Sequence, residues 1–248
     1  MESTIAQCHA EVLDALATVA SETGMTGRGE LVRADRRSQY QYLGLRTPDR
    51  RRRVARGFSF TSGADQHVLT TWDGIWNDTD NGDVLFAVLD FYLARGVDHI
   101  VDDFWRTSAG WIDRVDNWAH ADDLARLYSY ALEADRDGVY PTLEQWSHTE
   151  SEWRRRVSVV SLIHYSGKNA VFMPIEPCLD LVANCVADPR DTVSKAVGWV
   201  LRELLATYPD EVTEFLQLHV AAMPAPAFRR ATERLPAEQR QRLRSARD

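Results

Sequence analysis

The segment DTVSKAVGWVLREL, residues 191–204, decides the fold because its apolar spacing is that of an amphipathic helix. With 3.6 residues per turn, its valines and leucines gather on one side, which predicts a core-facing stripe. Lys195, Trp199 and Arg202 fall on the opposite side, with Gly198 next to the indole. A tryptophan between two cations is unusual on a solvent-facing surface. We therefore expect this face to line a groove; the alternative is that Trp199 is a half-buried packing residue.

Similar helical patterns continue along the chain, and no strand-like alternation interrupts them. In RTPDRRRRVARGF (46–58), Thr47 is the expected N-cap and Pro48 lies in the first turn. Further helices are expected in NGDVLFAVLDFYLARG (81–96), HADDLARLYSYALEADRDG (120–138), SEWRRRVSVVSLIHYSG (151–167) and PDEVTEFLQLHVAAM (209–223). Short loops separate them, and no low-complexity linker divides the chain. The sequence predicts an all-α protein with a single domain over residues 1–248.

Three segments with similar patterns begin about 40 residues apart. WIDRVDNWA, EWRRRVSVV and KAVGWVLRE begin at positions 111, 152 and 195. HEAT-type helix pairs repeat at this interval, and the equivalent helices of a stacked array line one concave surface. The sequence therefore predicts an α-α superhelix, a HEAT/armadillo-like solenoid, in which Asp116, Arg156 and Trp199 line a shared groove.

The distribution of charge is uneven. The net charge of −8 argues against indiscriminate binding of nucleic acid. Arginines nevertheless concentrate in residues 46–56, 153–156 and 229–247, and local fields decide where an anion binds. Arginine is also better suited than lysine to phosphate recognition.

Three charged segments have plainer interpretations. RRRR (50–53) is by default a solvated charge run, with phosphate contact as the alternative. In WRRR, only Arg156 is expected in the groove, while Arg154 and Arg155 are expected on the surface. HADD (120–123) is expected to be the solvated start of a helix, because no other metal-ligand cluster accompanies it.

The cysteines and the apolar segments limit the class of protein. Cys8, Cys178 and Cys185 lack CxxC spacing, so reduced thiols are expected rather than a zinc site or a disulfide framework. Cys178 and Cys185 lie in an apolar stretch and are expected to be buried. The amino-terminal segment does not resemble a signal peptide, and no apolar run reaches the ~18 residues needed to span a membrane. We expect a cytoplasmic monomer without a metal or an organic cofactor.

Four segments together resemble the AlkD-type DNA alkylation repair glycosylases. They are YLGLRTPDRR (42–51), WIDRVD (111–116), WRRRVSVV (153–160) and KAVGWVLRE (195–203), in the order and at roughly the spacing of that family. The resemblance extends from about residue 33 to residue 231. It implies a solenoid of HEAT-like repeats with a concave DNA-binding face. It also implies a monofunctional glycosylase of the 3-methyladenine/7-methylguanine type, which acts on alkylated purines in double-stranded DNA without flipping the base.

The resemblance also assigns roles to individual residues. Asp116 matches the catalytic carboxylate of the family, and Trp199 matches the aromatic residue that packs against the sugar of the lesion. Arg156 and Arg202 match arginines that contact the DNA backbone, and Lys195 lies on the same face as Trp199 and Arg202.

One position departs from the family pattern. A second pocket tryptophan is replaced by Ile112, so either Trp111 or Trp118 substitutes for it or the pocket lacks one aromatic wall. We include Trp111 among the expected DNA-binding residues. The acidic net charge is a second departure, because proteins of this family are usually basic.

The glycosylase reaction that the resemblance implies requires few catalytic groups. A purine alkylated at N3 or N7 is cationic and leaves readily, so a single carboxylate that stabilises the developing charge on the sugar suffices. Two alternatives remain: a HEAT-repeat protein that binds damaged or branched DNA without excision, which Ile112 favours, and a protein-binding scaffold, which the acidic net charge would suit.

Overall fold

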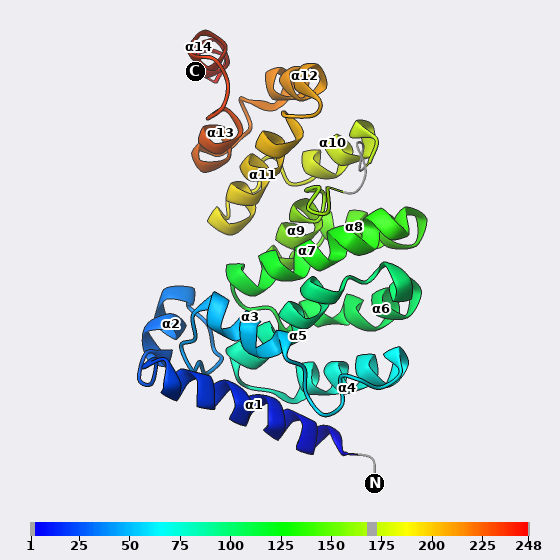
Figure 1. Cartoon of the computed structure of the whole chain (residues 1–248). Coiled ribbons are helices and arrows are strands. Elements are labelled where there is room, and N and C mark those ends of the chain that lie inside the picture. Colours follow the sequence, from blue (N-terminus) through cyan, green and yellow to red (C-terminus); the bar gives the residue numbers. More distant parts are fainter. Residues whose placement is uncertain (1–2, 168–172, 248) are drawn as a thin grey trace. The chain divides into compact units, whose positions relative to one another are not determined.

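The computed structural model describes residues 3–167 and 173–247, and within them it contains fourteen α-helices, two 3-10 helices and no β-strand (Figure 1). The predicted all-α class is therefore confirmed. The chain divides into two compact units, Met1–Leu127 and Tyr128–Asp248, and the boundary falls inside helix α7 (Trp118–Ala134). The expectation of one domain over residues 1–248 stays a prediction.

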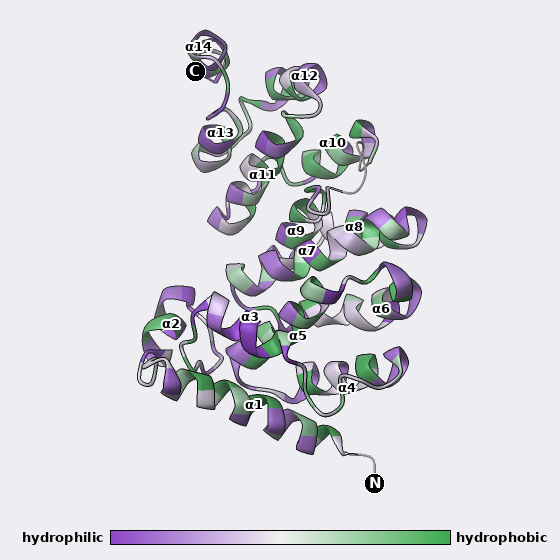
Figure 2. Cartoon of the chain, in the orientation of Figure 1, coloured by the Kyte–Doolittle hydropathy of each residue, from purple (hydrophilic) through white to green (hydrophobic). Residues whose placement is uncertain are grey.

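The first unit is built around α5 (Gly82–Arg95), whose residues from Gly82 to Tyr92 are all buried. Helices α1, α3 and α4 all pack against α5. The helical elements other than α5 and α7 are α1 (Ile5–Glu22), α2 (Gly29–Arg36), α3 (Thr47–Ala55), α4 (Asp65–Asp78), η1 (Asp98–Ile100), α6 (Val101–Ser108) and η2 (Ala109–Arg114). Figure 2 shows hydrophobic and hydrophilic residues alternating along α1, as an amphipathic helix requires.

Helix α3 differs from the sequence expectation at both its start and its surface. Its first residue is Thr47, and its N-cap is Arg46, which makes no side-chain capping bond. Arg50, expected in a solvated charge run, is 1% exposed. Its Nε donates to Asp90 at 2.8 Å, and Arg51 donates to the other oxygen of the same carboxylate at 2.9 Å. Part of the arginine run is therefore a buried link between α3 and α5.

The second unit has two rows of helices. The first row contains α9 (Glu152–Val160), α11 (Asp191–Leu204) and α13 (Ala225–Ala231), in which α11 packs against both of its neighbours. The second row contains α8 (Arg136–Ser147), α10 (Ile175–Ala183) and α12 (Pro209–His219), again with direct contacts between neighbours. The chain ends with α14 (Ala237–Ser245). Alternation of consecutive helices between two rows is the arrangement of stacked helix-pair repeats.

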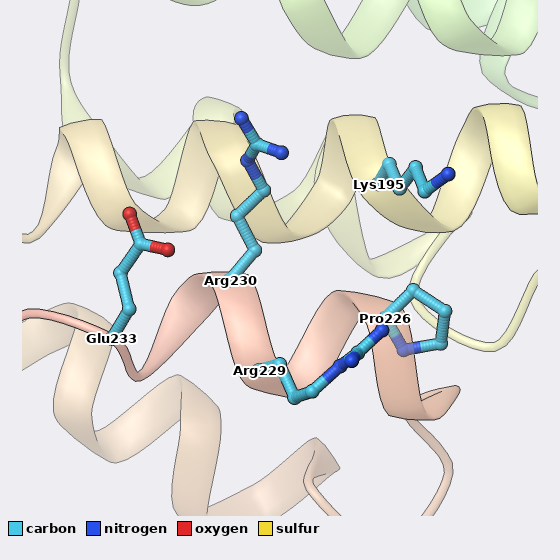
Figure 3. Close-up of a pocket in the computed structure, with 5 residues that line it drawn as sticks. All are labelled: Lys195, Pro226, Arg229, Arg230 and Glu233. Atoms are coloured by element: carbon cyan, nitrogen blue, oxygen red, sulfur yellow. The ribbon is translucent and has the colours of Figure 1, made fainter.

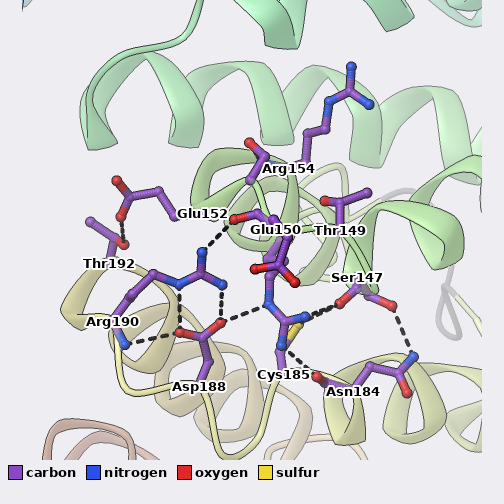
Figure 4. A network of polar contacts seen from close by, with 12 residues as sticks. Ser147, Thr149, Glu150, Glu152, Arg154, Asn184, Cys185, Asp188, Arg190 and Thr192 are labelled. Carbon is purple, nitrogen blue, oxygen red and sulfur yellow. Dashed lines mark hydrogen bonds and ion pairs between the residues drawn. The ribbon is translucent and has the colours of Figure 1, made fainter.

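A buried polar network fixes the loop that precedes α11 (Figure 4). Asp188 forms an ion pair with Arg155 at 2.7 Å and accepts from Arg190 at 2.5 and 2.9 Å, while Arg155 donates to the carbonyl oxygens of Ser147 and Asn184. Burial alone would raise the pKa of Asp188, but hydrogen bonds from Arg190 and the two nearby positive charges outweigh it, so the pKa lies below its usual value. Arg155 was expected on the surface. Instead it joins α9 to the end of α8 and to the segment between α10 and α11.

None of the helices in the described part of the chain is both long and apolar enough to cross a membrane. All three cysteines are free and buried, which confirms the expectation for Cys178 and Cys185.

Candidate active site

Asp116 lies in the short loop between η2 and α7, and four contacts orient its carboxylate. The Ser38 hydroxyl oxygen lies 3.0 Å from Oδ1 and 2.9 Å from Oδ2. The Gln39 amide donates to Oδ2 at 2.6 Å, and the Asn117 side-chain amide donates to Oδ1 at 2.8 Å. All of these donors are neutral, so the carboxylate is held in place without a cationic partner among them. Asp116 itself is half-buried.

The end of α2 places Ser38 against this carboxylate. Arg37 adopts the left-handed conformation, with φ of +53°, and turns the chain at the helix terminus. The Ser38 oxygen then accepts from the Tyr40 amide at 3.1 Å and from the Tyr42 hydroxyl at 3.2 Å. Burial raises the pKa of the Tyr42 phenol, so Tyr42 remains a donor. Because two donors already point at Ser38, its own proton is directed to Asp116.

Asn117 donates to Asp116 and is itself held by His120 and by the start of α7. The Asn117 Oδ1 accepts from the backbone amides of Ala119 and His120 and so caps α7. Its Nδ2 therefore faces Asp116 and lies 2.8 Å from His120 Nδ1. His120 is fully buried, burial lowers its pKa to about 3, and its Nε2 lies 3.0 Å from the Gly82 carbonyl oxygen. The network assigns a neutral imidazole that donates from Nε2 and accepts from Asn117 at Nδ1.

This burial corrects the expectation for HADD, since His120 is a core residue and not part of a solvated helix start. Sequence reasoning also missed Ser38 and Asn117. Asn117 directly precedes a helical pattern, and that N-cap signal could have identified it. Ser38 carries no such signal, because its contact with Asp116 spans 78 residues.

The tryptophans near Asp116 occupy different environments. Trp111 is 1% exposed, its Nε1 donates to Asp73 at 2.7 Å, and its ring stacks on Trp76 with 5.1 Å between centroids. Trp111 is therefore a core residue in this structure, and the expectation that it contacts DNA stays a prediction. Ile112 is also buried. Trp118 is 49% exposed and lies two residues after Asp116, so it is the tryptophan of this segment that can offer a face to a ligand.

In the second unit, α11 carries Lys195 and Trp199 as expected. The Lys195 side chain is 52% exposed and pairs with Asp191 at 2.5 Å. Trp199 is half-buried and meets Tyr165 edge to face, with 6.5 Å between ring centroids. The opposite face of α11, which includes Val193, is buried. The two-faced character of this helix is thus confirmed.

The two arginines expected at the DNA backbone both contact protein atoms. Arg156 on α9 is 6% exposed and donates to the Thr192 carbonyl at the start of α11. Arg202 donates to Glu203 at 2.6 Å and also to Glu233. Burial alone would lower the pKa of Arg202, but the two carboxylates raise it above its usual value. Both guanidinium groups therefore have a structural role within the second unit.

The described residues contain no group of three or more His, Cys, Asp or Glu side chains arranged to hold a metal ion. Asp116 and Trp118 belong to the first unit, and Arg156, Lys195 and Trp199 belong to the second.

The described residues form an all-helical fold, with two rows of helices in the second unit, and comparison with known proteins identifies the family. The family profile described as DNA alkylation repair enzyme matches residues 11–235. The chain therefore belongs to the DNA alkylation repair enzyme family.

A solved structure described as a predicted DNA alkylation repair enzyme from Enterococcus faecalis is similar in fold, with a TM-score of 0.66 and 16% sequence identity. The similarity covers 84% of this chain and 95% of that one. Comparison with curated protein sequences gives no significant match.

Proposed function

We propose that this protein is a monofunctional DNA glycosylase that excises cationic N3- or N7-alkylated purines from duplex DNA, as the first step of base excision repair. The proposal rests above all on the Asp116 carboxylate, which neutral donors from Ser38, Gln39 and Asn117 hold in one orientation. Membership of the DNA alkylation repair enzyme family supports DNA as the substrate. The protein would act as a cytoplasmic monomer, associated with the nucleoid when it is bound to DNA.

In the proposed reaction, the bond between C1′ of the deoxyribose and the purine nitrogen breaks, and its electron pair neutralises the cationic base. Positive charge develops on the sugar, and the fixed carboxylate of Asp116 stabilises it. A water molecule then forms the new bond to C1′ and gives up a proton, for which Asp116 is the acceptor. The products are a neutral alkylated purine and an abasic sugar.

No acid needs to protonate the leaving base, because alkylation has already made it cationic. One carboxylate therefore suffices where ordinary glycoside hydrolysis uses two. His120 would be unsuited to the role of an acid, since burial lowers its pKa to about 3 and keeps it neutral.

Aromatic residues would contribute to recognition of the charged lesion. A cation near an aromatic face gains about 0.5–2 kcal/mol. We propose Trp118 and Trp199 for this role, because Trp118 is 49% exposed and Trp199 is half-buried beside Lys195 on the outer face of α11. Recognition by surface contacts of this kind would require no extrusion of the base from the duplex.

A non-catalytic DNA-binding protein is the second candidate function. Ile112, in place of the second pocket tryptophan of the AlkD-type glycosylases, favours it, since Ile112 is buried and offers no aromatic wall. The fixed carboxylate of Asp116 argues for catalysis, because phosphate binding alone has no use for a negative charge.

A base-release assay separates these functions. Wild-type protein is incubated with duplex DNA that contains 7-methylguanine, and free base is measured against the spontaneous rate. Asp116→Asn should lower the rate at least ~100-fold, the loss typical of removing a key electrostatic group, while duplex affinity is kept. Asp113→Asn is the control, since this exposed carboxylate lies three residues away. Release at no more than the spontaneous rate by both wild type and Asp116→Asn would exclude the glycosylase and leave the DNA-binding protein.

A further inference from the structure

A groove of about 230 Å³ between α11 and α13 carries positive charge to which Lys195 of the KAVGWVLRE motif contributes only a part (Figure 3). Its lining residues are Lys195, Pro226, Arg229, Arg230 and Glu233. We propose that this groove binds a backbone phosphate of duplex DNA through Arg229 and Arg230, which lie outside the family motifs, together with Lys195. The choice of DNA as the partner rests on the proposed function. The choice of a phosphate as the bound group rests on the residues that line the groove.

Gly198 allows the two helices to approach closely enough to form the groove. A Cβ atom at this position would lie 2.4 Å from the Ala227 carbonyl oxygen and 2.8 Å from the Arg230 Cβ. Only a glycine therefore permits α13 to rest on the backbone of α11 here. Gly198 lies three residues after Lys195, so this close contact brings Arg230 to the helix that carries Lys195. Figure 3 shows Arg230 extending from α13 toward α11.

The acidic groups around the groove are already engaged. Glu233 accepts a hydrogen bond from Arg202, and this bond, with smaller contributions from the Arg230 and Arg234 charges, lowers the pKa of the Glu233 carboxyl. Glu203 accepts from Arg202 and from Arg234. These carboxylates therefore stay ionised and remain occupied by arginines outside the groove.

Arg229 and Arg230 are left without such partners. Both side chains are exposed, and neither forms a hydrogen bond or an ion pair with any residue that the structure describes. Lys195 adds a third positive charge and is balanced by Asp191. The groove is thus a local positive site on a chain whose net charge is −8.

This arrangement suits a phosphodiester. Guanidinium groups bind phosphate oxygens through two parallel N–H donors, and they retain their charge at every physiological pH. Arg229 and Arg230 follow one another on α13, and Lys195 lies across the groove on α11, so donors from both helices can reach a tetrahedral anion. Such a contact positions the duplex and carries no sequence information. It would also compensate locally for the acidic net charge, since the local field decides where an anion binds.

The test is the affinity of the full chain for an undamaged duplex oligonucleotide, measured by fluorescence anisotropy over a series of NaCl concentrations. Arg229→Gln/Arg230→Gln should weaken binding about tenfold at low salt. It should also reduce the slope of log affinity against log salt by about 1, since one phosphate contact is lost. Both side chains are exposed, so the thermal unfolding midpoint should not change and a folding defect is separable.

Arg106→Gln/Arg136→Gln is the matched control. It removes the same two charges from exposed side chains on α6 and α8, each of which pairs with a neighbouring aspartate. We expect its affinity to stay within about twofold of wild type. If the two double variants lost affinity equally, the effect would come from net charge alone, and the inference would be overturned.

Base release separates this inference from the proposed glycosylase. If the wild type releases no 7-methylguanine but only the groove variant loses affinity, the glycosylase fails and the phosphate site stands. If release depends on Asp116 while the two double variants bind alike, the phosphate site fails and the glycosylase stands. A wild type that binds no duplex at any salt concentration would overturn the groove assignment.

Discussion

The hydroxyl group of Ser38 lies within 3.0 Å of both carboxylate oxygens of Asp116, although 78 residues separate the two in sequence. This contact fixes the direction of the carboxylate, because the Ser38 oxygen is itself held by Tyr40 and Tyr42. The end of α2 therefore positions the group that we propose for catalysis.

Ser38→Ala should lower the rate of base release about tenfold, since one hydrogen bond that orients the carboxylate is worth roughly 1 to 1.5 kcal/mol. Duplex affinity should not change, because Ser38 acts on Asp116 and not on DNA. Release rates and binding are measured in parallel, and Ser38→Thr, which retains the hydroxyl, should recover most of the rate. An unchanged rate in Ser38→Ala would show that Asp116 needs no such support.

Substitution of Trp118 and of Trp111 should affect the free energy of unfolding to very different extents. Trp118→Ala should change the free energy of unfolding by less than about 0.5 kcal/mol, as for exposed sites, and should weaken binding of a lesion-containing duplex. Trp111→Ala should destabilise the fold by about 3–5 kcal/mol, because it removes a stacked and hydrogen-bonded core residue. Urea unfolding and duplex binding of both variants provide the measurements. A stable Trp111→Ala variant with reduced DNA affinity would reverse this assignment.

His120 should make the fold sensitive to acid. Its pKa is about 3 in the folded state, against about 6.5 when it is unfolded. Between these values the unfolded state binds a proton that the folded state does not. The free energy of unfolding should therefore fall by up to about 1.4 kcal/mol per pH unit as the pH drops from 6.5 toward 3. Stability from this group is fully present above pH 6.5.

The measurement is urea unfolding of wild type and His120→Gln at pH 7, 5.5 and 4.5. Glutamine cannot titrate, so the stability difference between the two proteins should shrink as the pH falls. Comparison of the two curves removes the contributions of the carboxylates that they share. Parallel curves would contradict a neutral buried imidazole.

Gly198→Ala should destabilise the second unit by about 1–3 kcal/mol, the usual cost of overpacking. The added methyl group would lie 2.4 Å from the Ala227 carbonyl oxygen, so α13 would have to move away from α11. Gly110→Ala is the control, because nothing lies within 4 Å of a Cβ atom there. Thermal unfolding of the two variants is compared. A Gly198→Ala variant as stable as Gly110→Ala would show that the helices can separate without cost.

The helical class and the two faces of α11 could be predicted because both depend on local periodicity. Val193 and Lys195 lie on the expected sides, since a helix of this length keeps its phase. Trp199 is half-buried, as the alternative interpretation of the sequence held, and its position in a groove stays a prediction. Helical phase cannot specify how deeply a large side chain enters the surface, because that depends on neighbours such as Tyr165.

The remaining features depend on contacts between distant segments. Trp111 and Trp118 could not be ranked, because Trp111 lies in the 3-10 helix η2 and Trp118 begins α7, so no shared helical phase relates them. Arg50 was assigned to solvent because its partner Asp90 lies 40 residues away on another helix. Ser38 was missed for the same reason. Local patterns therefore predicted the elements, while the support of Asp116 required the three-dimensional arrangement.

The three cysteine thiols provide built-in reporters of local opening. Burial raises the pKa of Cys8, raises that of Cys178 to about 12 and raises that of Cys185 to about 11, so the reactive thiolate is scarce in the folded protein. Alkylation by a thiol reagent would then require exposure of the chain around each cysteine. Cys8 lies in one compact unit and the other two lie in the second, so mass-resolved labelling would report the opening rate of each unit separately, without any engineered probe.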